Sequence, residues 1–331
     1  MQAVDVVVTT PIDEALLKRM AAVSDKIKVE SVSAMIVGER KGDTSAKEQL
    51  DSRLAQAEVL YGWIHHLPRN FLARTPRLKW LQVMSAGVDR LPEDILRSPI
   101  AVTCVSGLHA IPISEFVLEQ MLMIVKQAPE CFRQKQEKRW KRFTPQILHS
   151  KTIGIVGLGS IGREVARLAK AFGMRVIGTR RSAKKTGQSR YVDALYPREQ
   201  LPQLLAESDF VVLTLPLTAE TKGMIGEKEL RAMKPEAFLI NVARGAIVDE
   251  EALIRALEEK WIAGAGLDVF VAEPLPPESK FWTLPNVIFS PHVSGEMPDY
   301  DLRATEVFCE NLRRYLAGKK FLHAVDKQKG Y

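Results

Sequence analysis

The chain has 331 residues, 46% of them hydrophobic, which is enough to form the cores of two domains of ordinary size. Its net charge of +7 accompanies no recognisable nucleic-acid-binding motif, so no nucleic-acid partner is expected. The first apolar run contains Asp5 and has no basic start, and the apolar segment 111–125 is interrupted by Glu115 and Glu119. Neither a signal peptide nor a membrane span is therefore expected.

The three cysteines are far apart and odd in number. This argues against a disulfide framework and indicates a reducing, cytoplasmic compartment. No Cys/His spacing suggests a metal site, so none is expected.

Short apolar runs alternate with helical patterns along the first third of the chain, which is typical of a parallel sheet covered by helices. The expected strands are Val4–Val8, Ile27–Glu30, Ala57–Gly62, Lys79–Met84 and Ile100–Cys104. The expected helices are Pro11 to about Val23, Ala46–Gln56, Pro68–Thr75 and the long apolar Pro112–Lys126. Residues 38–42 resemble a loop, and the charged, poorly periodic stretch Ala128–Ser150 resembles an arm or linker.

The same alternation continues in the second half of the chain. The expected strands are Thr152–Val156, Arg175–Gly178, Phe210–Leu215, Phe238–Val242, Gly264–Val269 and Asn286–Ser290. The expected helices are Lys228–Met233, Glu250–Glu259 and the amphipathic Asp301–Leu316, and the residues after Phe321 are expected to form a tail.

A glycine pattern, G-x-G-x-x-G, directly follows the apolar strand 152–156 and opens a helix that ends near Gly173. In this context the pattern predicts a dinucleotide-binding turn. The first glycine makes the turn, the second lets backbone approach a pyrophosphate, and the third lets helix and strand pack closely. Free N–H groups of the first helical turn suit phosphates. A glycine-rich turn of another α/β unit is the alternative. The expected cofactor-binding residues are Gly157, Gly159, Ser160, Ile161 and Gly162.

The next strand ends at a basic segment rather than at the acidic residue that an NAD-preferring site uses for the ribose hydroxyls. A guanidinium cannot accept a hydrogen bond, but it pairs well with a phosphate. Arg180, Arg181 and Ser182 are therefore expected to bind the cofactor, with NADP(H) preferred and NAD possible. The alternative is a solvated basic loop that tolerates either cofactor.

Three polar residues follow three strands of this half: Arg244, Glu273 and His292. In a parallel sheet they lie at one edge, where an Arg can bind a carboxylate or carbonyl oxygen and a His can donate a proton to a carbonyl that receives hydride. A Glu bonded to the other imidazole nitrogen fixes the tautomer. This set predicts reduction of 2-keto acids. Each residue also has a non-functional alternative: Arg244 could cap a turn, Glu273 could be an exposed carboxylate, and His292 could be a loop histidine.

Two loops in the N-terminal third also follow strands, where ligands of open α/β sheets bind. Backbone N–H groups of Ser85, Ala86 and Gly87 could hold a substrate carboxylate, although an ordinary turn into a helix fits as well. Trp63 is a candidate substrate contact, and a packed aromatic is the alternative.

Several motifs together resemble the signatures of the D-isomer-specific 2-hydroxyacid dehydrogenases. They are the glycine pattern, Thr214–Thr218 with Thr221, Asn241–Gly245, Leu267–Phe270 running to Glu273–Leu275, and Ser290–Gly295. The resemblance implies an α/β fold with two Rossmann-like or flavodoxin-like parallel-sheet domains and an active site in the cleft between them. It implies a split substrate-binding domain, 1–106 with 293–331, and an inserted NAD(P)-binding domain, 107–292.

The resemblance also assigns roles by position. It makes Arg244 the substrate-binding residue, Glu273 the residue that orients the imidazole, and His292 the acid/base. The implied cofactor contacts are Pro216, Thr221, Val242, Ala243, Asp268 and Gly295. The arm around Trp140 is similar to the family's dimerisation region, so a homodimer is expected.

Within this family, Glu273 argues against a formate dehydrogenase, and the basic segment 179–182 is similar to that of glyoxylate and hydroxypyruvate reductases that use NADPH. The expected function is reduction of small 2-keto acids to D-2-hydroxy acids. Two alternatives stay open: a dinucleotide-sensing corepressor-like protein, and a phosphoglycerate dehydrogenase-like enzyme that uses NAD.

Overall fold

The computed structural model describes residues 3–330 and divides the chain into two compact units. One unit contains the residues up to Leu108 together with those from Met297 onward, and the other is His109–Glu296. The divisions predicted from the sequence were 106/107 and 292/293. The outermost positions of the predicted substrate-binding segments, 1–2 and 331, lie outside the described residues. The predicted α/β class with parallel sheets is confirmed.

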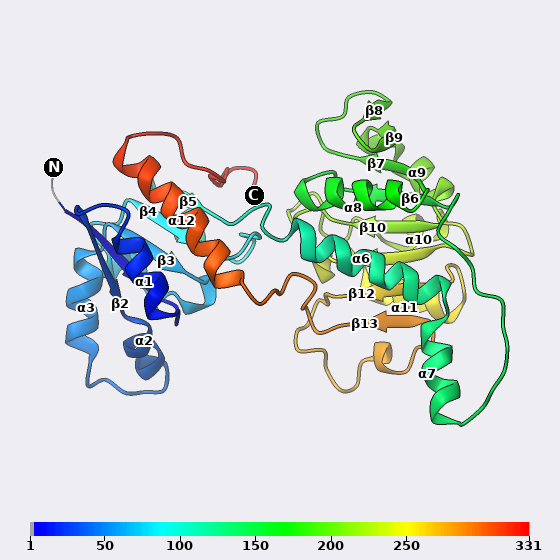
Figure 1. The fold of residues 1–331 in the computed structure, drawn as a ribbon, viewed down its shortest axis with the longest axis horizontal. Coiled ribbons are helices and arrows are strands. Elements are labelled where there is room, and N and C mark those ends of the chain that lie inside the picture. Colours follow the sequence, from blue (N-terminus) through cyan, green and yellow to red (C-terminus); the bar gives the residue numbers. More distant parts are fainter. Residues whose placement is uncertain (1–2, 331) are drawn as a thin grey trace. The chain divides into compact units, whose positions relative to one another are not determined.

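The split unit is built on a five-stranded parallel sheet in the order β2-β1-β3-β4-β5 (Figure 1). Its strands are β1 Val4–Val8, β2 Ile27–Ser31, β3 Val59–Gly62, β4 Trp80–Val83 and β5 Ala101–Thr103. Its helices are α1 Glu14–Ala21, α2 Ser33–Arg40, α3 Lys47–Gln56, α4 Phe71–Arg74, α5 Glu93–Arg97 and α12 Tyr300–Leu316. Met20 of α1 and Phe308 of α12 belong to the apolar cluster on one face, and Ile36 of α2 and Leu54 of α3 to the cluster on the other.

The second unit is built on an eight-stranded sheet in the order β13-β12-β11-β10-β6-β7-β9-β8, parallel except at β8. Its strands are β6 Thr152–Val156, β7 Arg175–Thr179, β8 Gly187–Ser189, β9 Val192–Tyr196, β10 Phe210–Leu213, β11 Phe238–Asn241, β12 Gly264–Leu267 and β13 Val287–Phe289. Its helices are α6 Ala110–Val125, α7 Ala128–Gln136, α8 Ser160–Ala171, α9 Leu201–Glu207, α10 Glu227–Arg231 and α11 Glu250–Glu258.

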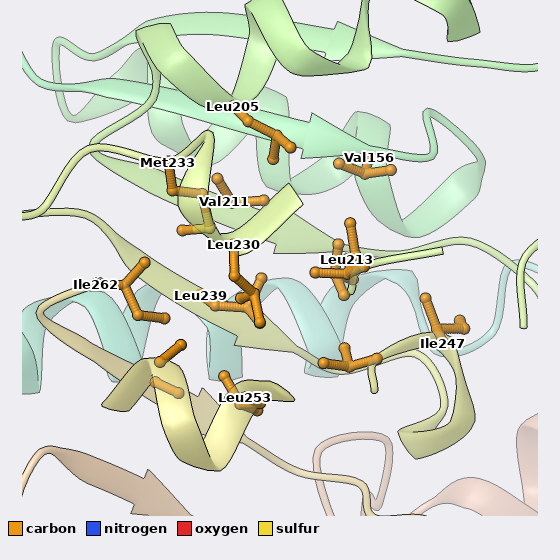
Figure 2. Packing of buried hydrophobic residues seen from close by; sticks show 14 of the residues in the cluster. Val156, Leu205, Val211, Leu213, Leu230, Met233, Leu239, Ile247, Leu253 and Ile262 are labelled. Carbon is orange, nitrogen blue, oxygen red and sulfur yellow. The ribbon is translucent and has the colours of Figure 1, made fainter. Parts of the chain in front are cut away.

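Helices cover both faces of this second sheet, so its central strands β6, β10, β11 and β12 are buried along nearly their whole length. On one face, side chains of α9, α10 and α11 pack on the strands, as Leu205, Leu230 and Leu253 do in Figure 2. On the other face, α6 and α8 lie side by side and cover the sheet. All parallel strands therefore end at one edge, and the loops after them carry the candidate site.

Two boundaries in the first third were predicted wrongly. The first helix begins at Glu14 rather than at Pro11, because the Asp13 carboxylate caps it by accepting a hydrogen bond from Ala15 N at 2.8 Å. Residues 38–40 belong to α2 rather than to a loop, because Ile36, only 1% exposed, anchors that helix to the core. Its burial outweighs the roughly 1 kcal/mol that Gly38 costs in a helix.

Two segments expected to be irregular are ordered by polar contacts. Residues 128–136 form α7, whose Gln134 side chain accepts a hydrogen bond from Lys141 N at 2.9 Å and so turns the chain after the helix. The predicted tail docks on the first sheet: Ala324 bridges Thr103, and Val325 N donates to Val102 O at 2.9 Å. Lys327 Nζ donates to the carbonyl oxygens of Ile95 and Ser98, each at 2.8 Å.

No element was predicted between the end of β7 and β10, where the structure has β8, β9 and α9. Among residues 3–330, no helix combines the length and the apolar character needed to cross a membrane.

Candidate active site

The glycine turn between β6 and α8 has the shape that the sequence predicted. Gly157 has φ +108°, which favours glycine, and a Cβ there would lie 2.9 Å from the Leu215 backbone. A Cβ on Gly162 would lie 2.2 Å from Gly157 O, so this glycine lets α8 pack against the turn. Gly159, at the start of α8, has open space where its Cβ would point. The turn therefore leaves room for a phosphate at the helix N-terminus, beside Ser160 and Ile161.

A buried hydroxyl lies beside this turn. Thr179, at the end of β7, accepts hydrogen bonds through its carbonyl oxygen from Gly157 N at 3.0 Å and Leu158 N at 3.2 Å. Its Oγ1 is buried and has no hydrogen-bond partner among residues 3–330. Because a buried hydroxyl normally has a partner, this orphan fits a polar group of a bound nucleotide. The glycine turn, the N-terminus of α8 and the hydroxyl of Thr179 together fit a bound dinucleotide.

The basic segment after β7 is exposed. Arg180 and Ser182 are exposed, and Ala183 N donates to Arg180 O at 3.0 Å to make a turn. Arg181 Nη2 lies 3.8 Å from Glu220 Oε1. Arg180 directly follows β7, and no ion pair of its side chain is found within residues 3–330.

The loop after β10 is closed by a threonine. Thr221 Oγ1 donates to Pro216 O at 2.7 Å and accepts from Thr218 N at 2.8 Å. Its hydroxyl therefore shapes the Pro216–Thr221 turn, while contact of either residue with a cofactor stays a prediction.

A buried carboxylate organises the loop that carries His292. Asp268 follows β12, is 1% exposed, and accepts hydrogen bonds from Ser290 Oγ at 2.7 Å, from Val293 N at 2.9 Å and from the backbone N and hydroxyl of Ser294. His292 itself has φ +57°, a conformation that costs a non-glycine residue about 1 kcal/mol or more. The bonds of Asp268 on both sides of His292 hold the loop in this conformation.

His292 and Glu273 form a hydrogen-bonded pair at this edge. His292 Nδ1 lies 2.9 Å from Glu273 Oε2, and the other oxygen, Oε1, accepts from Phe270 N at 3.0 Å. The Glu273 side chain is 22% exposed and that of His292 is 44% exposed. Because Nδ1 is bound by a carboxylate, Nε2 is the nitrogen available for proton transfer.

Arg244 follows β11 at the same edge. The buried Asn241 shapes its turn: Asn241 Oδ1 accepts from Ala243 N at 3.1 Å, and Asn241 Nδ2 donates to Arg244 O at 3.0 Å. Val242 and Ala243 are buried beneath it. Gly245, the residue after Arg244, packs closely against the loop that carries Glu273. A Cβ on Gly245 would lie only 2.0 Å from the Phe270 carbonyl carbon.

A second histidine lies close to these residues. His109 precedes α6, and its ring packs against Gly295, where a Cβ would lie 2.8 Å from His109 Cδ2. Burial lowers the pKa of His109 to about 4, and the positive charge of Arg244 contributes to this. His109 is therefore neutral near pH 7.

The predicted substrate residues lie in the other unit, at the ends of the neighbouring strands β3 and β4. Trp63 is half-buried and stacks on Tyr300 with ring centroids 5.3 Å apart. Ser85 Oγ donates to Gly87 O at 2.7 Å, which closes the loop around Ala86. The structure thus brings Glu273 and His292 into contact, and shows Trp63 and Ser85 packed within their own unit.

Sequence reasoning assigned no role to several residues that build the site, although three of them lie inside the quoted motifs. They are Thr179, Asn241, Ser290, Ser294 and, beside the loop of Glu273, Glu250. All are polar residues at or just after an apolar strand, or at a helix start. Their position at strand ends is a signal, but their partners are distant in sequence.

Known proteins are similar to this chain in sequence and in fold. Residues 118–294 match the family described as "D-isomer specific 2-hydroxyacid dehydrogenase, NAD binding domain". A glyoxylate reductase of Thermococcus gammatolerans is 42% identical over 263 residues, which are 76% of this chain and 78% of that protein. The chain belongs to the D-isomer-specific 2-hydroxyacid dehydrogenases, which are NAD(P)-dependent enzymes.

Two solved structures are similar over nearly the whole chain. A D-isomer-specific 2-hydroxyacid dehydrogenase of Xanthobacter autotrophicus in complex with NADPH and MES has a TM-score of 0.81 and 30% identity, covering 99% of this chain and 100% of that one. An NADPH-dependent glyoxylate/hydroxypyruvate reductase of Sinorhizobium meliloti in complex with NADP and sulfate has a TM-score of 0.81 and 26% identity, with the same coverage.

Proposed function

We propose that this chain reduces small 2-keto acids, of the glyoxylate and hydroxypyruvate type, to D-2-hydroxy acids with NADPH. The observation that carries the proposal is the hydrogen-bonded pair of His292 and Glu273, 2.9 Å apart, at the same sheet edge as the glycine turn. The Thermococcus and Sinorhizobium relatives, both named for glyoxylate reduction, support this substrate class.

His292 is the proton donor in this proposal. A bound nicotinamide supplies the hydride, and the carbonyl oxygen then needs a proton and a positive partner. His292 Nε2 donates that proton, while Glu273 accepts from Nδ1–H and stabilises the imidazolium before transfer. In the oxidation direction the same nitrogen accepts the proton.

Arg244 binds the substrate. Its guanidinium can hold a carboxylate by paired hydrogen bonds. The backbone N–H groups of Ser85–Gly87 and the indole of Trp63 are the proposed contacts from the other unit, so residues up to about 106 and from about 293 form the substrate-binding domain, and 107–292 form the NAD(P)-binding domain.

The preference for NADPH rests on Arg180. It follows β7 beside the orphaned hydroxyl of Thr179, and its charge suits the extra phosphate of NADPH. The NADPH and NADP complexes of the Xanthobacter and Sinorhizobium proteins support this choice. Arg181 and Ser182 are proposed to bind the same phosphate, and Pro216, Thr221, Val242, Ala243, Asp268 and Gly295 to line the rest of the cofactor site.

A homodimer is the proposed assembly. The segment from α7 to β6 exposes large apolar side chains, with Phe132 61%, Trp140 94% and Ile147 59% exposed. Large exposed apolar side chains of this kind are typical of an interface between subunits. Replacing Trp140 with Asp should raise the dimer dissociation constant at least tenfold in analytical ultracentrifugation; a wild-type chain that sediments as a monomer at micromolar concentration contradicts the dimer.

The cytoplasm is the proposed compartment. Cys104, Cys131 and Cys309 are all free thiols, and unpaired cysteines fit a reducing environment.

The function is tested by following NADPH and NADH oxidation at 340 nm with glyoxylate, hydroxypyruvate, pyruvate and bulkier 2-keto acids. We expect turnover with the small acids, a D product by chiral chromatography, and a higher kcat/KM with NADPH than with NADH. No turnover with any acid despite NADPH binding contradicts the reductase, and a clear NADH preference contradicts the role of Arg180.

A further inference from the structure

The loop that carries Glu273 is fixed by two carboxylates rather than one. Phe270 N donates to Glu273 Oε1 at 3.0 Å, and the next amide, Val271 N, donates to Glu250 Oε1 at 2.6 Å. Hydrogen bonds from backbone amides to carboxylates are charge-assisted and strong. Two successive amides of the loop are therefore each held by a carboxylate.

Glu250 is well placed for this role. It is the first residue of α11, and the preceding Asp249 caps that helix by accepting from Ala252 N at 3.1 Å. The helix start is thus fixed independently of the loop. The close approach of Gly245 to the Phe270 backbone also limits movement of the loop.

The charge of Glu250 also interacts with the carboxylate of Glu273. Burial raises the pKa of the Glu250 carboxyl, the hydrogen bond from Val271 N opposes this rise, and the negative charge of Glu273 adds to it, so the two carboxylates are electrostatically coupled. The basic residues on packed elements are engaged elsewhere: Arg255 of α11 and Arg231 of α10 both bond Glu227, at 3.1 and 2.9 Å. The other two basic groups are Arg244, whose Nη1 donates to Ala243 O, and His292, which is bonded to Glu273. Glu250 has no ion pair of its own within residues 3–330.

We propose that Glu250 is a positioning residue for the reaction: its carboxylate holds the loop Phe270–Glu273, and its negative charge adds to that of Glu273 in stabilising the protonated form of His292. The proposal rests on the proposed roles of Glu273 and His292. Its main observation is the hydrogen bond from Val271 N to the Glu250 carboxylate, and Glu250 lies outside the motifs that carry the family resemblance.

Two substitutions separate the two parts of this role. Glu250→Gln keeps an oxygen that can accept from Val271 N but removes the charge, and Glu250→Ala removes both. Glu251→Gln is the matched control, because Glu251 is the next residue of the same helix and is exposed. All are made in the full chain, and thermal unfolding confirms that each is folded.

The first readout needs no substrate. Hydrogen exchange of the peptide that spans residues 270–273, followed by mass spectrometry, should be at least tenfold faster in Glu250→Ala than in wild type and nearly unchanged in Glu250→Gln and Glu251→Gln. Equal exchange rates in Glu250→Ala and wild type overturn the proposal that the Glu250 carboxylate holds this loop. This readout is independent of the proposed function, which fails separately if the wild-type chain reduces no 2-keto acid.

The second readout is the pH profile of kcat/KM for the keto acid. Reduction needs the protonated imidazole, so activity declines as the pH rises. Without the negative charge, this alkaline limb should move to lower pH in Glu250→Gln. The limb should not move in Glu251→Gln. A Glu250→Gln profile that coincides with that of wild type overturns the electrostatic part, since a merely structural residue would leave the profile in place.

Discussion

The two units share one construction and differ in the loops at the ends of their strands. Apart from the antiparallel β8, both are parallel sheets with helices on both faces, and in both the loops after the parallel strands lie at a single edge. In the second unit, that edge combines an open glycine turn, the buried carboxylate of Asp268 and His292, whose backbone has a left-handed conformation. In the split unit, the corresponding edge is closed by its own contacts, as in the bond of Ser85 to Gly87 and the stacking of Trp63 on Tyr300.

This difference teaches that the architecture provides a place for a site but not its chemistry. Glu273, His292 and the buried Asp268 are titratable groups ordered by hydrogen bonds at this edge. Ordering such groups costs free energy, which proteins typically spend at functional sites. Hence we expect substitutions at the edge of the second unit to affect the reaction itself, and those in the split unit to affect mainly which substrate is accepted.

The largest effect is expected for His292. Replacing His292 with Ala removes the proton donor and should lower kcat by roughly 10²–10⁴-fold, measured as NADPH oxidation at 340 nm. The dissociation constant for NADPH, measured by fluorescence titration, serves as the control and should change less than threefold. Near-normal turnover would refute the assigned role.

A smaller and more selective effect is expected for Arg180. A charge-assisted hydrogen bond is worth about 1.5–3 kcal/mol, so Arg180→Ala should raise the KM for NADPH by roughly 10- to 100-fold. The KM for NADH should hardly change, because NADH lacks the phosphate. The control is Lys185→Ala, in the same exposed segment. If both cofactors weaken equally, Arg180 does not discriminate between them.

His109 should make the stability of the second unit depend on pH. Its pKa is about 4 in the folded chain, against an ordinary value of 6.5, because of burial and the charge of Arg244. The unfolded chain therefore binds this proton more readily, and the free energy of unfolding should fall as the pH drops from 6.5 to 4, by up to about 3 kcal/mol.

Urea unfolding of wild type and His109→Asn at pH 7.5 and pH 4.5 measures this contribution. The loss of stability on acidification should be smaller in the variant. An identical loss in both chains would show that another group causes it.

The smallest effect is expected for Trp63, in the split unit. Trp63→Ala should change the KM for bulkier 2-keto acids severalfold while kcat for glyoxylate stays within about threefold, because Trp63 belongs to the split unit and is proposed to contact the substrate rather than to transfer the proton. The measurement is the ratio of kcat/KM for the bulky and small acids. A loss of kcat as large as that of His292→Ala would contradict the contrast between the two edges.

Local pattern was sufficient for much of the fold and site. Apolar runs located most strands within one or two residues, and the glycine spacing predicted the turn at Gly157. The position of Glu273 and His292 after successive strands predicted that they lie at one edge, and they form a hydrogen bond. These features depend on period and turn chemistry, which act over a few residues.

Other features could not be predicted, because their partners are distant in sequence. Nothing near Gly38 indicates that Ile36 is buried, and nothing in the C-terminal segment indicates that Ala324 pairs with Thr103. Likewise, the sequence shows Asp268 and Glu250 as acidic residues near motifs but not that they bind the amides of Val293 and Val271.

The sequence by itself determined the family, the α/β class, the nucleotide-binding turn and the identity of the residues proposed for proton transfer, because each depends on residue type and short spacing. Only the tertiary structure decided which carboxylate oxygen meets His292, how Asp268 holds the histidine in a left-handed conformation, and that Glu250 reaches the neighbouring loop. These depend on how strands and helices pack, and packing brings together residues whose separation along the chain carries no local signal.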